Sequence, residues 1–133
     1  MKMKLQIKEG LTGVRCKFYI ESLHTLKRYY KLKIKEPLPY VVTGLDGLFF
    51  ANGLNCFIFL KKYVNTPRCN NALQHEINHL VKHIIRECGL GQNEEVHSYM
   101  VGEVTQLFKH RYNQLCKHKE KLQQQKLKKT KRK

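Results

Sequence analysis

The sequence predicts an α+β fold in which a small antiparallel sheet, a β-meander, packs on two helices. Residues 14–60 contain short segments of alternating apolar and polar residues, a pattern typical of strands. Residues 70–116 contain two longer segments whose apolar residues recur at helical spacing. Because a chain of 133 residues has room for one core, we expect a single domain at 1–116, followed by a basic tail at 117–133.

The first strands are predicted at residues 14–20 and 30–35, where Lys31-Leu32-Lys33-Ile34-Lys35 alternates most clearly. Residues 21–29 between them fit a short helix equally well, because Leu23, Leu26 and Tyr30 are spaced for one helix face. Two prolines, Pro37 and Pro39, then interrupt the pattern, which marks an edge strand or a connection.

Two turn dipeptides, Asp46-Gly47 and Asn52-Gly53, are of the kind that closes two-residue hairpins. They bracket the apolar segment 48–51, so we expect a strand there. The meander then ends in a strand at residues 54–60.

The first helix is expected to start at Asn70 or Asn71, either of which can cap it, and to end at Gly89. Its apolar residues share one face and are Leu73, Ile77, Leu80, Val81 and Ile84. Asn93 is expected to cap the second helix. The predicted buried side of this helix carries Val96, Tyr99, Met100, Val104, Leu107 and Phe108.

Positive charge is concentrated at the two ends of the chain. Residues 1–35 contain ten Lys/Arg against two Glu, and residues 117–133 contain nine against one, so each flank carries +8. The segment 36–116 is formally neutral, with seven basic and seven acidic residues. Such flanks suit nucleic acid or an acidic protein surface, although a Lys-rich tail can also serve solubility alone. Residues 117–133 hold few apolar residues, which predicts a fraying helix that leads into a disordered tail.

The remaining composition indicates a cytoplasmic protein. The five cysteines, Cys16, Cys56, Cys69, Cys88 and Cys116, are odd in number and form no Cys-x-x-Cys pair, which is typical of reduced thiols. The N-terminus lacks the apolar run of a signal peptide. No apolar stretch approaches the roughly 20 residues of a membrane span, so we expect no membrane partner.

The motif with chemical meaning is His75-Glu76-Ile77-Asn78-His79 on the first helix. Histidines at positions i and i+4 share a helix face, so both rings can bind one zinc ion, Zn²⁺. Glu76 lies beside that pair, where a carboxylate can take a proton from an attacking water and pass it to a leaving amine. The alternative is that these are ordinary surface or core histidines.

Zinc needs a third protein ligand, and the motif helix does not supply it. His83 lies about 12 Å along the helix axis from His75, too far to share an ion. The candidates on the second helix are Glu94, Glu95, His97 and Glu103. Glu95 is favoured because it shares a helix face with Tyr99 and Gly102, where close helix approach is possible.

These two motifs, at residues 75–79 and 93–102, resemble the gluzincin pattern, and specifically small phage-encoded zinc peptidases. The resemblance covers about residues 45 to 108. It implies a zincin-like domain, with Glu95 as the third zinc ligand and a substrate peptide paired with the free edge of the strand at 54–60. Only fifteen residues separate His79 from Glu95, and a tight hairpin would instead place Glu103 nearer the level of His79. Tyr99 stands where many gluzincins have an Asp, and it either packs in the core or binds substrate.

The sequence therefore predicts a zinc-dependent metallopeptidase, a hydrolase of a peptide or protein substrate with Glu76 as general base. The alternative function is a non-catalytic, zincin-like binding protein that contacts nucleic acid or an acidic protein through its basic flanks. A Glu76→Gln variant separates the two functions, because it would abolish hydrolysis and leave nucleic-acid binding intact.

Overall fold

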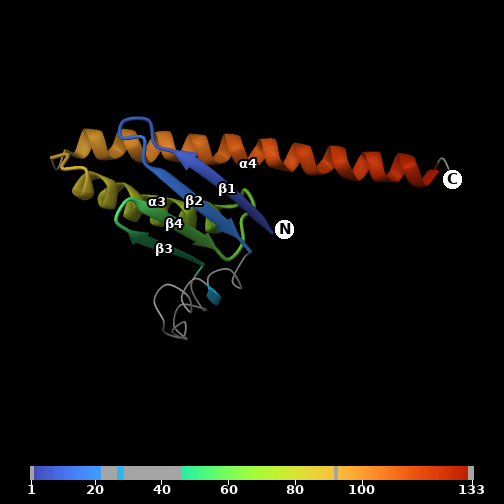
Figure 1. Cartoon of the computed structure of the whole chain (residues 1–133), viewed down its shortest axis with the longest axis horizontal. Helices are drawn as coiled ribbons and strands as arrows, with labels where there is room; N and C mark the ends of the chain where they lie inside the picture. Colours follow the sequence, from blue (N-terminus) through green and yellow to red (C-terminus); the bar gives the residue numbers. More distant parts are fainter. Residues whose placement is uncertain (1, 22–26, 29–45, 92, 132–133) are drawn as a thin grey trace.

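The structure, a computed structural model, describes residues 2–21, 27–28, 46–91 and 93–131. In this part of the chain, four strands form one sheet and two helices pack on it (Figure 1). The strands are β1 (Met3–Lys8), β2 (Arg15–Ile20), β3 (Gly47–Asn52) and β4 (Asn55–Leu60). The helices are α3 (Pro67–Glu87) and α4 (Glu94–Lys131). The predicted α+β class is confirmed. The strand predicted at 30–35 and most of the alternative helix at 21–29 lie outside the described residues.

The sheet is mixed, so the predicted antiparallel meander is wrong. Its strand order is β1-β2-β4-β3. The outer pairs, β1 with β2 and β3 with β4, are antiparallel, whereas β2 and β4 pair in parallel through the register Cys16↔Cys56 to Ile20↔Leu60. The segment between β2 and β3 crosses over the position of β4, and this non-local connection leaves no local signal in the sequence.

The β3–β4 hairpin closes at the predicted Asn52-Gly53 dipeptide. Asn52 pairs with Asn55, so Gly53 and Leu54 form the two-residue loop, and Gly53 has the positive φ of 60° that glycine adopts at no steric cost. Gly47, from the other dipeptide, is the first residue of β3 and pairs with Leu60. The turn predicted before it lies outside the described residues.

The core forms between the sheet and the two helices. β1 alternates buried and exposed residues, with Met3, Leu5 and Ile7 buried, and β2 does the same with Cys16, Phe18 and Ile20. The ring of Phe18 lies 5.0 Å from that of Phe108 on α4. All five predicted core residues of the first helix are buried: Leu73, Ile77, Leu80, Val81 and Ile84.

Helix α3 begins earlier than Asn70 or Asn71, which corrects the predicted start. Thr66 is the N-cap, its side-chain oxygen accepts from the Cys69 amide at 3.4 Å, and Pro67 occupies the first turn, where no amide hydrogen is needed. The predicted end at Gly89 is confirmed. Gly89 has a φ of 67°, and the Leu90 amide donates to the Ile85 carbonyl at 2.9 Å, which closes the helix.

Helix α4 starts as predicted, because the Asn93 side chain accepts from the Glu95 amide at 2.9 Å. Its buried face is narrower than predicted. Met100, Val104 and Phe108 are buried, but Tyr99 is 59% exposed and Leu107 36% exposed. The helix continues through residues 117–131, where the sequence predicts fraying and disorder, and it extends beyond the sheet as Figure 1 shows. Among the described residues, no helix has both the length and the apolar character needed to cross a membrane.

Candidate metal centre

His75 and His79 converge on the exposed face of α3. Their Nε2 atoms are 3.2 Å apart and their ring planes are nearly perpendicular, at 87°. Two nitrogens bound to one tetrahedral zinc at 2.0–2.1 Å would be about 3.3 Å apart, so this pair fits a metal without rearrangement. Partial desolvation, together with the nearby charges of His75 and Lys82, lowers the pKa of His79, which favours the neutral ring that a metal requires.

The histidines lie in a groove between α3 and β3. The groove has a volume of about 790 Å³, and residues 46–49 form its sheet side. Its helix side is formed by Arg68, Asn71, Ala72, His75, Glu76 and His79. β3 is an edge strand of the sheet, whereas β4 is paired on both sides. The predicted free edge at residues 54–60 is therefore wrong, and the edge beside the groove belongs to β3.

Glu76 points between the histidines' helix and β3, and it is buried, with 6% of its surface exposed. Burial raises the pKa of its carboxyl group, and the nearby His75 opposes that shift. Gly47 makes this position available. A Cβ atom on Gly47 would lie 2.9 Å from Cγ of Glu76 and 3.3 Å from Cδ2 of Leu60. Glycine is therefore required for Glu76 to approach the start of β3 in this way.

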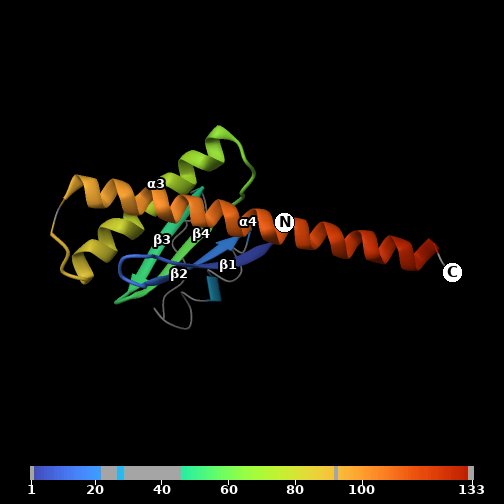
Figure 2. The same cartoon turned by 90° about the horizontal axis from the view of Figure 1, so that it is seen from above.

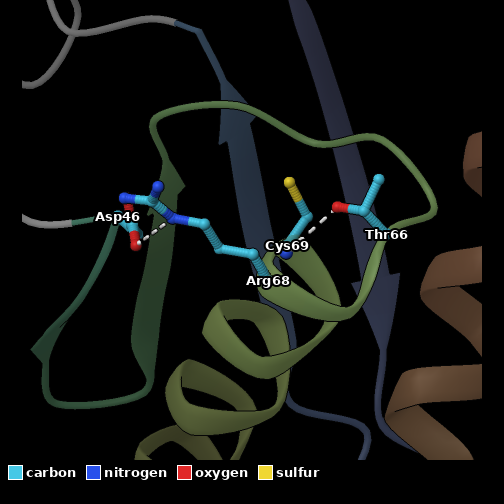
Figure 3. A network of polar contacts seen from close by, with 4 residues as sticks. All are labelled: Asp46, Thr66, Arg68 and Cys69. Atoms are coloured by element: carbon cyan, nitrogen blue, oxygen red, sulfur yellow. Dashed lines mark hydrogen bonds and ion pairs between the residues drawn. The ribbon is translucent and has the colours of Figure 1, made fainter.

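An ion pair holds one end of the groove (Figure 3). Arg68, in the first turn of α3, donates from Nε and Nη2 to the two carboxylate oxygens of Asp46, both at 3.2 Å. Asp46 directly precedes β3, so the pair connects the helix start to the strand start. Both side chains are solvent-accessible, at 82% and 44%, so the pair fixes geometry more than it adds stability.

The other end of the groove is held by His83 and Phe49. His83 Nε2 donates to the carbonyl oxygen of Gly53, 2.6 Å away at the tip of the β3–β4 hairpin. The Phe49 ring is nearly parallel to that of His79, with centroids 6.5 Å apart, and it also contacts His83 at 5.6 Å. His83 thus has a partner of its own, apart from the His75–His79 pair.

Sequence reasoning missed Gly47, Arg68 and Asp46 as parts of the site. A glycine at the start of an apolar strand indicates close approach of another group, but it does not say which group approaches. The Arg68–Asp46 pair spans 22 positions in the chain and has no sequence signature.

The predicted third ligand is not placed beside the histidines. Glu95 is exposed in the first turn of α4 and does not line the groove, and Glu94 is exposed as well. Within the described ranges, no three His, Cys, Asp or Glu side chains lie close enough to hold a metal ion. The assignment of Glu95 stays a prediction.

The other candidates on α4 have different surroundings. Glu103 accepts a hydrogen bond from the Gly10 amide at 2.7 Å, in the turn between β1 and β2. The Tyr99 hydroxyl lies 3.5 Å from the Glu103 carboxylate, and Tyr99 does not line the groove. His97 has a buried Nε2 with no hydrogen-bond partner in the part of the chain that the structure describes. The close helix approach expected at Gly102 is wrong, because a Cβ there would meet nothing within 4 Å.

Comparison of the chain with protein-family models, with curated proteins and with solved structures finds no match. We therefore infer the function from the residues of the site.

Proposed function

We propose that this protein is a zinc-dependent peptidase that hydrolyses a peptide bond with Glu76 as general base. The observation that carries the proposal is the geometry of the motif. His75 and His79 present their Nε2 atoms 3.2 Å apart, and the buried carboxyl group of Glu76 lies beside them in the same groove. Ordinary surface histidines would not require a buried glutamate and a side-chain-free Gly47 next to them.

The donor set suits zinc, since imidazole nitrogens at this separation match its tetrahedral geometry. When bound, zinc polarises a peptide carbonyl and lowers the pKa of water. His75 and His79 would supply two ligands. For the third, the resemblance favours Glu95, and position in the groove favours Asp46, the one other carboxylate that lines it besides Glu76.

The substrate is proposed to lie extended along the outer edge of β3. An edge strand offers backbone amides and carbonyls to a peptide, and this edge adjoins the groove that contains Glu76. Glu76 would accept a proton from the attacking water and transfer it to the leaving amine. Burial of its carboxyl group excludes competing bulk water from that side. Tyr99 as a substrate contact stays a prediction, because its side chain lies outside the groove.

Metal analysis of the purified protein tests the proposal at its base. We expect one zinc per chain, lost in His75→Ala and in His79→Ala. His83→Ala is the matched control, because His83 lies on the same helix and bonds to Gly53, and it should retain the metal. Equal metal loss in all three variants, or a folded wild-type chain that binds no zinc, would defeat the assignment.

Two further substitutions separate the base from the ligands. Glu76→Gln should retain zinc and abolish hydrolysis of a peptide library, because the base acts on water and not on the ion. Glu95→Ala and Asp46→Ala then identify the third ligand, since the variant that removes it should weaken zinc affinity by orders of magnitude. Retention of full zinc affinity in both would show that neither residue is the ligand.

A further inference from the structure

The two basic flanks of the chain, which are far apart in sequence, meet in the structure. Lys119 on α4 donates from Nζ to the carbonyl oxygen of Lys2, at 2.8 Å, directly before β1. α4 contacts β1 over the core side of that strand. Figure 2 shows the N-terminus of β1 beside α4, with the rest of the helix extending beyond it. The positive charge of both flanks is therefore gathered at one edge of the molecule.

The sheet contributes four cations to this edge, on the face turned away from the helices. Lys4, Lys8 and Arg15 are exposed, Lys17 is half-buried, and neither β1 nor β2 contains an acidic residue. We name these four side chains the basic edge. Lys8 and Arg15 stand directly opposite each other in the antiparallel register. Like charges in that position destabilise a sheet, so the arrangement needs a reason other than folding.

The end of α4 contributes the second part. Residues 117–131, which we name the tail helix, carry seven lysines against Glu120 alone. Every residue from Glu120 to Lys131 is exposed. The lysines point in all directions around the axis at 100° per residue. Leu122 and Leu127 are 44% and 62% exposed, but they lie about 140° apart around the helix, so they form no apolar stripe.

We propose that the basic edge and the tail helix bind duplex DNA through its phosphates. A protein partner or a second copy would need an apolar anchor, which the tail helix lacks, and a second copy would also repel a chain of charge +16. Phosphates need only cations. The tail helix is about 22 Å long and, at the usual helix diameter of about 10–12 Å, fits the B-DNA major groove. The deep, narrow major groove of duplex RNA does not admit it.

DNA binding is tested by the fluorescence anisotropy of a labelled duplex of about 20 base pairs, titrated with the full chain across a salt series. We expect the logarithm of the affinity to fall linearly with the logarithm of salt concentration. Replacement of all four basic-edge residues by Gln should reduce that slope by about 3. Deletion of residues 117–133 should weaken binding about tenfold or more, with the circular dichroism of the core retained.

A control variant with the same charge makes the test specific. Lys61, Lys62, Lys82 and Arg86 are exposed and lie outside the basic edge, so their replacement by Gln removes the same four charges, from +16 to +12. This variant should bind DNA within about twofold of wild type, and so should Glu76→Gln, because the proposed base takes no part in this surface. Equal loss in the control and basic-edge variants would overturn the proposal. Equal competition by duplex RNA or polyglutamate would also overturn it.

Discussion

Glu76 reaches its position because residue 47 has no side chain. A Cβ on Gly47 would lie 2.9 Å from Cγ of Glu76, a separation that forces one of the two to move. Gly47→Ala should therefore lower the free energy of unfolding by about 1–3 kcal/mol, the usual cost of overpacking. Urea denaturation measures the effect, and the proposed peptidase activity should fall with it.

Gly102→Ala is the matched control for that substitution. Gly102 lies within α4, is exposed, and a Cβ there would meet no atom within 4 Å. Alanine is the better helix former, so this variant should be more stable by about 0.5–1 kcal/mol. If both alanine variants changed stability in the same direction, crowding at Glu76 would not explain the Gly47 result.

The thiols give a second prediction for single residues, through their different burial. Burial raises the pKa of Cys16 well above its usual value and that of Cys56 to about 11, whereas Cys88 is exposed. Thiolate is the reactive form, so Cys88 should be alkylated first in the native protein and Cys16 and Cys56 only after unfolding. Both raised pKa values mean that the folded state holds these protons more tightly. The free energy of unfolding should therefore fall as pH rises from about 8.5 towards 11. A native-state alkylation series followed by mass spectrometry would contradict this if Cys16 reacted as fast as Cys88.

The motif residues could be predicted because helical spacing alone places them together. Positions i and i+4 put His75 and His79 on one face, and the buried face of α3 follows the same rule. The groove itself could not be predicted. Gly47 and Asp46 reach the site through the pairing of β3 with β4 and the crossing of α3 over that edge, and both are tertiary arrangements.

At the scale of the elements, caps and buried faces were predicted unevenly. Asn93 and Gly89 have strong, local roles that the sequence shows directly. Asn70 looked like a cap but accepts a hydrogen bond from the Tyr63 hydroxyl at 2.9 Å, while Thr66 before Pro67 caps α3. Tyr99 and Leu107 sit beside the true buried stripe of α4, and only the width of the neighbouring elements decides that they remain exposed.

Glu103 is predicted to anchor α4 to the turn between β1 and β2. Its Oε1 accepts from the Gly10 amide at 2.7 Å, so Glu103→Ala leaves that amide without its protein partner. We expect the free energy of unfolding to fall by about 1 kcal/mol, because a hydrogen bond to a charged group is lost where water can partly replace it. Zinc content should not change. Glu95→Ala provides the comparison, since Glu95 is exposed at the start of the same helix. A loss of zinc in Glu103→Ala without loss of stability would show that Glu103 is a ligand and not an anchor.

At the scale of the whole molecule, the strand order was beyond sequence reasoning. Each strand of the described part follows its own alternation of apolar and polar residues, but alternation does not state which strand is the neighbour. The parallel pairing of β2 with β4 puts Cys16 opposite Cys56 and leaves β3 as an edge. That order alone decides that the groove opens beside β3 and that the basic residues of β1 lie at the opposite edge.

The tail helix gives the last prediction, because nothing in the core holds its far end. Beyond Lys119, every described residue of α4 is exposed, so the helix there rests on intrinsic propensity. Its lysines repel one another at helical spacing, as Lys117 and Lys121 do at i and i+4, and salt screens that repulsion. Helix content should therefore rise with ionic strength. Circular dichroism at 222 nm measures it as the difference between the full chain and a chain ending at Lys119, from about 0.01 M to about 1 M salt. The difference should grow with salt, and it should also grow when duplex DNA neutralises the lysines at low salt. A difference signal that stayed constant under both conditions would show that lysine repulsion does not control this helix.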